Sequence, residues 1–375
     1  MKEKIKNLNP ILFNTYCIFA AFMTYACMYA FRKPFSVGTF EGDWFGIDYK
    51  IVLIISQVFG YTLSKFIGIK VVSEMPKKYR ALAIVGMIGL AELALLGFAI
   101  TPTPWNVGFL FINGLPLGMI WGFVFSFLEG RKTTELLGAG LSASFIVASG
   151  LVKSVGKWTM EMGVSEYWMP FATGLIFFPF LILFVYLLNM IPEPDQKDVE
   201  QRVLRQPMNG KERWSFFKNF APGLTALVFL YMLLTAYRDF RDNFAREIWD
   251  SLGFADMPSI FTMSEIPIAA GVLIVFAFLV KIKDNHKAVE VMHFIMLAGA
   301  TLIGLSTFAF DRGLIGPVPW MICAGLGLYL GYVPFGCMLF DRLIANVGLV
   351  ATAGFMIYVT DAFGYLGSVI LLLYK

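Results

Sequence analysis

The sequence has few of the residues that soluble proteins present to water and that enzymes use for catalysis. Only 15% of its 375 residues are charged, against ~25% in soluble proteins. Its two histidines, His286 and His293, are seven residues apart near the start of one predicted helix, with no cysteine beside them, and we expect no metal site there. We find no nucleophile–base pair and no nucleotide-binding loop. These absences argue against an enzyme, and we expect no metal and no cofactor.

Cysteines and clustered basic residues are also scarce. The four cysteines, Cys17, Cys27, Cys323 and Cys337, all lie inside apolar segments. We interpret them as small packing residues, because a disulfide framework needs an oxidising aqueous compartment. The net charge of +4 is small and its basic residues are spread along the chain. This distribution gives no support for nucleic-acid binding.

Apolar residues, in contrast, are abundant. The hydrophobic share is 58% and the mean hydropathy is +0.70. Soluble domains contain ~45–50% apolar residues even when glycine is counted among them. A soluble fold of this size would have nowhere to place the excess. The sequence therefore predicts an all-α polytopic membrane protein whose main solvent is lipid.

A membrane helix needs ~20 mostly apolar residues, and the chain contains eleven such runs. The first follows the sequence MKEKIKNLNP and ends in aromatic residues and Arg32–Lys33. It is too long and wrongly flanked for a cleaved signal peptide, so we expect it to stay attached. The predicted spans lie near 11–31, 49–70, 80–101, 105–129, 136–159, 167–190, 219–240, 257–281, 288–309, 316–341 and 346–373.

The longest polar stretch divides these spans into six and five. We predict an N-terminal six-helix bundle over 1–190, a linker over 191–218 and a C-terminal bundle over 219–375. Basic residues recur in every second loop, the linker included, so the positive-inside rule places the N-terminus and the linker in the cytoplasm. Eleven spans are one short of two six-helix halves, and we expect the twelfth helix to be absent from this chain.

An internal repeat supports two related halves. Tyr25 precedes Arg32 by seven residues in the first span, and Tyr231 precedes Arg238 by seven residues in the seventh span. Seven residues are two helical turns, so each pair shares a face. Glycine-rich matches in the fourth and tenth spans recur at nearly the same offset. Many membrane carriers are built from two such repeats around a central site.

The two repeat arginines are the strongest candidates for a binding site. An arginine inside a membrane span is costly, and snorkelling to the headgroups is the alternative explanation. Arg32 shares a helix face with Tyr25 and Tyr29, at i, i+4 and i+7 spacing. Two guanidiniums that face each other across a cavity would bind one oxyanion, because the donor fork of arginine is rigid and bidentate.

Two lysines also fall inside predicted spans. Lys65 lies about one turn from the cytoplasmic end of the second span, where snorkelling and a site role are equally compatible with its position. Lys153 lies near the middle of the fifth span, one turn after Ser149. Snorkelling is harder from there, which favours a cavity-facing role for Lys153.

Acidic residues inside the spans leave several interpretations open. Glu265 and Asp361 either pair with the intramembrane cations or carry a coupling proton, and the sequence does not separate these options. We interpret Glu92 as the partner in an interhelical hydrogen bond. The alternating charges of residues 239–247 are typical of a solvated, self-paired helix end, and we leave them out of the site.

Several stretches resemble the major facilitator superfamily and, within it, the organophosphate:phosphate antiporters such as the bacterial glycerol-phosphate and hexose-phosphate carriers. YACMYAFRKPF (25–35) is similar to the first helix of that family, with two tyrosines before an Arg-Lys pair. SKFIG (64–68) resembles its second helix, and Glu265 falls in a similar glutamate-bearing eighth helix. The most specific match is AFGYLGS (362–368), which resembles the eleventh helix.

The resemblance implies roles for particular residues. One arginine from each half, Arg32 and Arg238, would bind a phosphoryl group. Lys65 would add positive potential to the cavity. The tyrosines that would line this cavity are Tyr25, Tyr29, Tyr332 and Tyr365.

The chain also departs from the family pattern at two places. Ser149 stands where the family has a histidine, and Lys153 is a residue that could compensate. The gating motif after the second helix is degraded, with Glu74 as its stand-in. The substrate could therefore differ from those of the known carriers.

The resemblance implies a monomeric, multi-pass inner-membrane transporter that exchanges a small phosphorylated metabolite for inorganic phosphate. Its partners would be this anionic substrate and the lipid bilayer. Two alternatives stay open. One is a membrane sensor of the same fold that binds phosphate esters without substantial flux. The other is a proton- or sodium-coupled carrier for a carboxylate or another small solute, with Glu265 or Asp361 as the coupling group.

Overall fold

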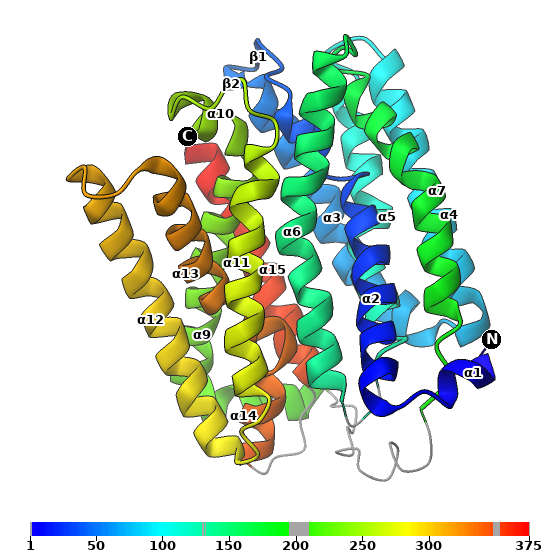
Figure 1. The fold of residues 1–375 in the computed structure, drawn as a ribbon, viewed down its shortest axis with the longest axis vertical. Helices are drawn as coiled ribbons and strands as arrows, with labels where there is room; N and C mark the ends of the chain where they lie inside the picture. The colour runs from blue at the N-terminus through cyan, green and yellow to red at the C-terminus, as the bar shows by residue number, and fades with distance from the viewer. Residues whose placement is uncertain (1, 130, 132, 195–209, 348–352, 375) are drawn as a thin grey trace. The chain divides into compact units, whose positions relative to one another are not determined.

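The computed structural model describes residues 2–129, 131, 133–194, 210–347 and 353–374, and this part of the chain is almost entirely helical (Figure 1). The strands within it are β1 (Asp43–Trp44) and β2 (Ile47–Asp48), a short antiparallel hairpin. The chain forms two compact units. Unit 1 consists of Met1–Asp195 and Arg241–Met263, and unit 2 of Gln196–Phe240 and Ser264–Lys375.

Unit 1 contains most of the N-terminal helices. It also includes a segment from the second half of the chain, Arg241–Met263, which we call the cap segment. The predicted boundaries place this segment in the C-terminal bundle. The elements of unit 1 are α1 (Lys2–Lys6), α2 (Pro10–Tyr29), the 3₁₀ helix η1 (Pro34–Val37), α3 (Tyr49–Glu74), α4 (Lys77–Ile100), α5 (Val107–Phe125), α6 (Thr134–Glu161), α7 (Met169–Asn189) and, in the cap segment, α10 (Ala245–Ser251).

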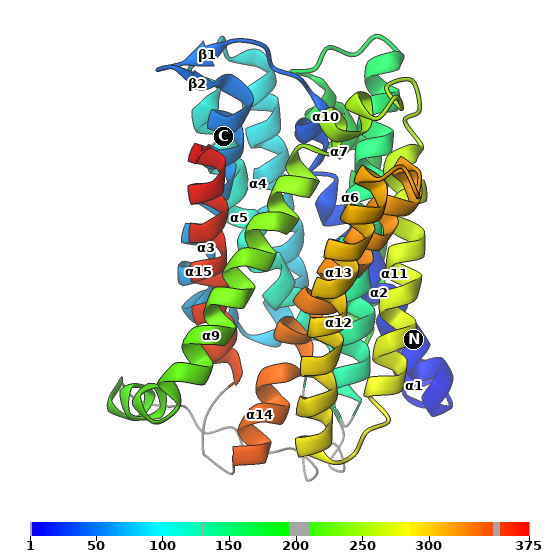
Figure 2. The ribbon, with the colours of Figure 1, turned by 90° about the vertical axis from the view of Figure 1, so that its left-hand side faces the viewer.

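Unit 2 is built from the remaining helices, two of which continue into the cap segment. Within unit 2, helices α12 and α13 lie side by side in both views (Figures 1 and 2). The helices of unit 2 are α9 (Gly210–Asn243) as far as Phe240, α11 (Ile260–Leu279) from Ser264, α12 (Asn285–Asp311), α13 (Pro317–Cys337), α14 (Leu339–Val347) and α15 (Ala353–Tyr374).

Ten helices of the described residues are long and apolar enough to cross a membrane. They correspond to the first ten predicted spans, so the predicted fold class is confirmed. The predicted eleventh span, 346–373, falls in part on residues 348–352, which lie outside the described residues. Most of the rest of it is α15, Ala353–Tyr374, which contains the apolar stretch Val359–Tyr374.

Large apolar side chains face outward along these spans. Phe180, Phe278 and Phe294, for example, are more than half exposed. Such a surface would cause aggregation in water. In a bilayer it is the surface that contacts the lipid tails.

Glycines let the backbones of α3 and α5 approach each other closely. A Cβ added to Gly114 would overlap the backbone of Gln57, and one added to Gly118 would overlap the backbone of Tyr61. Small residues at a membrane helix interface permit this contact. The packing fixes Gln57 and Tyr61 on α3, and both side chains belong to the site described below.

Local signals set the two ends of α2. The helix begins at Pro10 after an Asn9 cap, whose Oδ1 accepts from the Leu12 N–H at 2.8 Å. It ends at Tyr29, and Pro34 then opens η1. Arg32 and Lys33 lie in the turn between α2 and η1, with both side chains buried.

Candidate functional site

Two cations of unit 1 share one aromatic ring. The guanidinium carbon of Arg32 lies 3.8 Å from the ring centroid of Tyr61, and the Lys65 ammonium lies 5.3 Å from the same centroid. Tyr61 and Lys65 are one helical turn apart on α3. Arg32 is 5% exposed and Tyr61 is 2% exposed, so the cation–π contact is well shielded from water. Arg32, Lys65 and Tyr61 form what we call the Arg32 half-site, in which Arg32 and Tyr61 are buried and Lys65 is half-buried.

The predicted tyrosine stripe precedes this half-site on α2. Tyr25 and Tyr29 are both buried, and their rings meet edge to face with centroids 5.6 Å apart. They belong to the last two turns of the helix before Arg32. Unit 1 thus contains four of the predicted binding residues, Arg32, Tyr25, Tyr29 and Lys65.

Two buried amides hold the turn that carries Arg32. Gln57 Nε2 donates to the Arg32 carbonyl at 3.1 Å and to Asn113 Oδ1 at 2.8 Å. Asn113 Nδ2 donates to the carbonyls of Phe31, at 2.9 Å, and Ala91, at 3.0 Å. This network joins α3, α4, α5 and the end of α2. The sequence analysis did not single out these amides, although polar residues within apolar spans are a usable signal.

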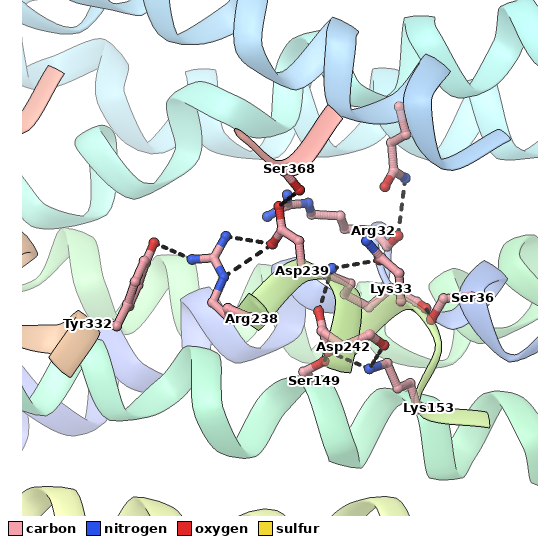
Figure 3. Close-up of polar contacts among 12 residues, drawn as sticks. Arg32, Lys33, Ser36, Ser149, Lys153, Arg238, Asp239, Asp242, Tyr332 and Ser368 are labelled. Atoms are coloured by element: carbon pink, nitrogen blue, oxygen red, sulfur yellow. Dashed lines mark hydrogen bonds and ion pairs between the residues drawn. The ribbon is translucent and has the colours of Figure 1, made fainter. Parts of the chain in front are cut away.

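A second cluster of unit 1 surrounds the carboxylate of Asp242 (Figure 3). Lys33 and Lys153 both form ion pairs with it, and the Ser149 hydroxyl donates to it. Lys33 also donates to Asn243 Oδ1 at 3.1 Å. Both lysines are buried. Two ammoniums on one carboxylate leave this cluster with a net positive charge, and Lys153 is occupied by Asp242 in this conformation.

The rest of the cap segment is attached to unit 1 by similar contacts. Lys50 pairs with Glu247, and Arg246 donates to the Val37 carbonyl. Lys157 donates to the Ala255 carbonyl. These contacts explain why the segment belongs to unit 1. The interpretation of residues 239–247 as a solvated, self-paired stretch is wrong, because most of their partners lie far away in the sequence.

The second repeat arginine belongs to unit 2 and has different neighbours (Figure 3). Arg238 donates to Asp239 Oδ1 through Nε, at 3.1 Å, and through Nη2, at 2.7 Å. Its Nη1 donates to the Tyr332 hydroxyl, and Asp239 Oδ2 accepts from Ser368 at 2.7 Å. The guanidinium fork is therefore engaged by an adjacent carboxylate that neutralises its charge.

A tyrosine–carboxylate network continues from Tyr332. Its ring stacks on that of Tyr231, with centroids 5.0 Å apart and hydroxyls 2.9 Å apart. The Tyr231 hydroxyl donates to Asp361 Oδ1 at 2.7 Å. Tyr365 is buried and close enough to Arg238 to interact with it electrostatically. Unit 2 thus brings the predicted residues Arg238, Tyr332, Tyr365 and Asp361 into one neighbourhood.

Two further predicted residues are the gating and coupling candidates Glu74 and Glu265. Glu265 is half-buried on α11 of unit 2. Glu74 is the last residue of α3, and its side chain lies outside the described part of the chain. The roles of both residues stay predictions. A single site that joins Arg32 to Arg238 also stays a prediction, since each arginine is described within its own unit.

The helical architecture is shared with a solved transporter. The crystal structure of the nucleoside transporter NupG is similar to this chain with a TM-score of 0.56, at 16% sequence identity, over 95% of this chain and 90% of that one. At this identity the similarity shows the fold alone. The chain is a helical, multi-pass membrane protein with the fold of this solved structure.

The family membership is shown by the sequence. Residues 34–375 match the model described as "Family of unknown function (DUF5690)", so the chain belongs to this family. No curated protein matches the chain significantly.

Proposed function

We propose that the chain is a secondary transporter that exchanges a small anionic, phosphorylated metabolite for inorganic phosphate by alternating access. The observation that carries this proposal is the pair of cations, Arg32 and Lys65, on the Tyr61 ring inside unit 1. The transporter fold and the resemblance of the first and eleventh helices to organophosphate:phosphate antiporters also support it.

Arg32 is the better anion ligand of the two repeat arginines. Both guanidiniums lie over a tyrosine ring, at 3.8 Å from the Tyr61 centroid for Arg32 and at 4.4 Å from the Tyr332 centroid for Arg238, but the fork of Arg238 is also engaged by Asp239. In the proposed complex, a phosphoryl group binds the N–H edge of Arg32, because the rigid fork of a guanidinium matches two phosphoryl oxygens. We therefore assign the main anion contact to unit 1 and assign Arg238 to a secondary role.

Charge also explains why an anion would promote transport. Buried cations are costly inside a membrane, and an anionic ligand lowers this cost. Arg32 and Lys65 would be compensated when the phosphoryl group binds. The loaded carrier would then change conformation more readily than the empty one, which is the behaviour expected of an obligatory exchanger.

The test is counterflow of labelled inorganic phosphate in proteoliposomes that contain the purified full-length chain. We expect rapid exchange for the wild type, and at least tenfold slower exchange for Arg32→Lys and Lys65→Gln. Lys78→Gln is the matched control, because it removes an exposed lysine from α4 of the same unit. Exchange at wild-type rate by Arg32→Lys would remove this residue from the site and contradict the proposal.

A second candidate is a proton-coupled carrier for a polar solute, favoured by one observation in unit 2. Asp361 accepts a hydrogen bond from Tyr231 beside the ion-paired Arg238, an arrangement suited to a carboxyl that gains and loses a proton. The similar solved protein is named as a nucleoside transporter. Uridine uptake driven by a pH gradient, without internal phosphate and abolished by Asp361→Asn, would favour this candidate over exchange. Phosphate binding without flux would favour a sensor.

A further inference from the structure

One buried carboxyl of unit 1 takes no part in the clusters described above. Glu92 lies within α4, eight residues before its end at Ile100, and is 6% exposed. Neither of its carboxyl oxygens has a hydrogen-bond partner among the residues that the structure describes. The sequence interpretation of Glu92 as an interhelical hydrogen-bond partner is therefore wrong for the described residues.

Among the described residues, the helices that pack mainly against that of Glu92 provide no compensating charge. Helix α4 packs mainly against α5 and α7, and neither of these helices contains Asp, Glu, Lys, Arg or His. The titratable side chain of α7 is Tyr186, three turns beyond Gly174. The nearby cations at the end of α2 are engaged elsewhere: Arg32 lies on Tyr61, and Lys33 pairs with Asp242.

The contact with α7 is shaped to hold the carboxyl. A Cβ added to Gly174 would overlap the Glu92 carboxyl oxygens, so the missing side chain makes the space that they occupy. The hydroxyl of Thr173, the preceding residue, is also buried and has no partner among the described residues. Glu92 is thus buried with its carboxyl group directly against Gly174 of α7.

An ionised carboxylate without a cation is strongly disfavoured in such a place, whereas a neutral carboxyl is tolerated. We propose that Glu92 is a proton-binding site of unit 1. It holds its proton while α4 and α7 are packed together, and it releases the proton to water when this interface opens. The carboxyl then becomes a carboxylate, and protonation restores the closed interface.

The site is linked to the Arg32 half-site through the backbone. The carbonyl of Ala91, the residue before Glu92, accepts from Asn113, and Asn113 also bonds the Phe31 carbonyl and Gln57. Gln57 in turn holds the Arg32 carbonyl. A movement of α4 that accompanies protonation therefore acts on the turn that carries Arg32. This inference goes beyond phosphate exchange, because it adds a proton to the transport cycle.

The first test measures protonation directly and does not depend on transport. Infrared spectra of the chain in lipid nanodiscs are recorded at about pH 6, 7 and 8, well above the usual pKa of a glutamate. They should contain the C=O band of a protonated carboxyl, and this band should be missing from the spectra of Glu92→Gln. Glu161→Gln, which removes an exposed carboxyl at the end of α6, should leave this band unchanged. A wild-type spectrum that matches that of Glu92→Gln would overturn the proposal.

The second test uses the wild-type chain and a hydrophobic carbodiimide, which reacts with protonated carboxyls in apolar surroundings. We expect Glu92 to be the main modified carboxyl by mass spectrometry, with labelling that slows as the pH rises. An unlabelled Glu92, or labelling that does not change with pH, would contradict a proton site there. Both measurements stay decisive if phosphate exchange is not observed, so failure of the proposed function and failure of this inference can be told apart.

A third measurement separates proton binding from a structural role. Gly174→Ala places a methyl group where the Glu92 carboxyl lies, so the carboxyl must move although Glu92 itself is kept. We expect this variant to ionise Glu92 at lower pH than the wild type and to weaken its carbodiimide labelling several-fold. If Gly174→Ala leaves both the infrared band and the labelling unchanged, the enclosure by α7 does not hold the proton and the proposal fails.

Discussion

Arg32 of unit 1 and Arg238 of unit 2 are matched in the sequence repeat, yet their charged neighbours differ. Each follows a tyrosine by seven residues. Arg32 stacks on Tyr61 beside a second cation, whereas Arg238 forms an ion pair with its own neighbour, Asp239. The shared spacing therefore gives the two arginines neither the same local structure nor the same neighbours, since Arg32 lies in the turn after α2 and Arg238 lies inside α9.

The residue after each arginine accounts for the difference. Arg32 is followed by Lys33, which pairs with Asp242 of the cap segment. Arg238 is followed by Asp239, which neutralises it directly. One half-site thus places two cations on a single tyrosine ring, and the other pairs its arginine with an adjacent carboxylate. We therefore expect an anion to bind more strongly in unit 1 than in unit 2. Each of the following substitutions tests a part of this comparison.

Removing the guanidinium of unit 2 should have the largest effect on stability. Arg238→Met leaves the carboxylate of Asp239, which is 2% exposed, without its cation. Breaking a buried ion pair on one side costs about 3–5 kcal/mol. We expect a clearly lower melting temperature in detergent, and recovery of most of the loss in the double variant Arg238→Met with Asp239→Asn. Equal melting of single variant and wild type would show that the pair is not buried as described.

Asp242→Asn should have the next largest effect, in unit 1. It leaves the buried ammoniums of Lys33 and Lys153 without their shared carboxylate, and we expect a loss of about 2–4 kcal/mol. Thermal unfolding measures the change. The control is Asp256→Asn, which removes an exposed carboxylate from the same cap segment and should melt like the wild type. A stable Asp242→Asn variant would contradict the role of this cluster in holding the cap segment.

Exchanging arginine for lysine should separate the two half-sites by affinity. Arg32→Lys loses the bidentate fork and part of the contact with Tyr61, a difference on the order of 1–2 kcal/mol. We expect about tenfold weaker binding of inorganic phosphate by isothermal titration, with little change in melting temperature. Arg238→Lys keeps a cation beside Asp239 and should weaken phosphate binding less. The reverse order of the two affinities would assign the main anion contact to unit 2.

The smallest effect is expected at the hydroxyl that links Arg238 to the tyrosine network. Tyr332→Phe keeps the stacked ring but removes the acceptor of Arg238 Nη1. The loss of one such hydrogen bond costs about 1 kcal/mol. Differential scanning fluorimetry should detect a small decrease in stability, while Tyr374→Phe, at an exposed position, should cause none. A large decrease would indicate that the network does more than support Arg238.

Much of the fold was predictable because its signals are local. Apolar runs of membrane-spanning length gave the positions of ten helices, and Asn9, Pro10 and Pro34 mark where α2 begins and η1 follows. Of the candidate site residues, Arg32 stood out because a charge in an apolar span is rare. Gln57 and Asn113 carry the same signal more weakly, and their importance is visible only through the carbonyls they hold.

By itself, the sequence determined that this chain is a helical membrane protein and which charged residues its spans contain. These properties follow from composition and from the period of a helix, so neighbouring residues suffice to reveal them. Only the tertiary structure decided that Asp242 pairs with Lys33 and Lys153, that Arg238 is neutralised and that Glu92 is enclosed without a counterion. The physical reason is that the free energy of a buried charge depends on the groups around it. Most of those groups come from helices that are distant in the sequence.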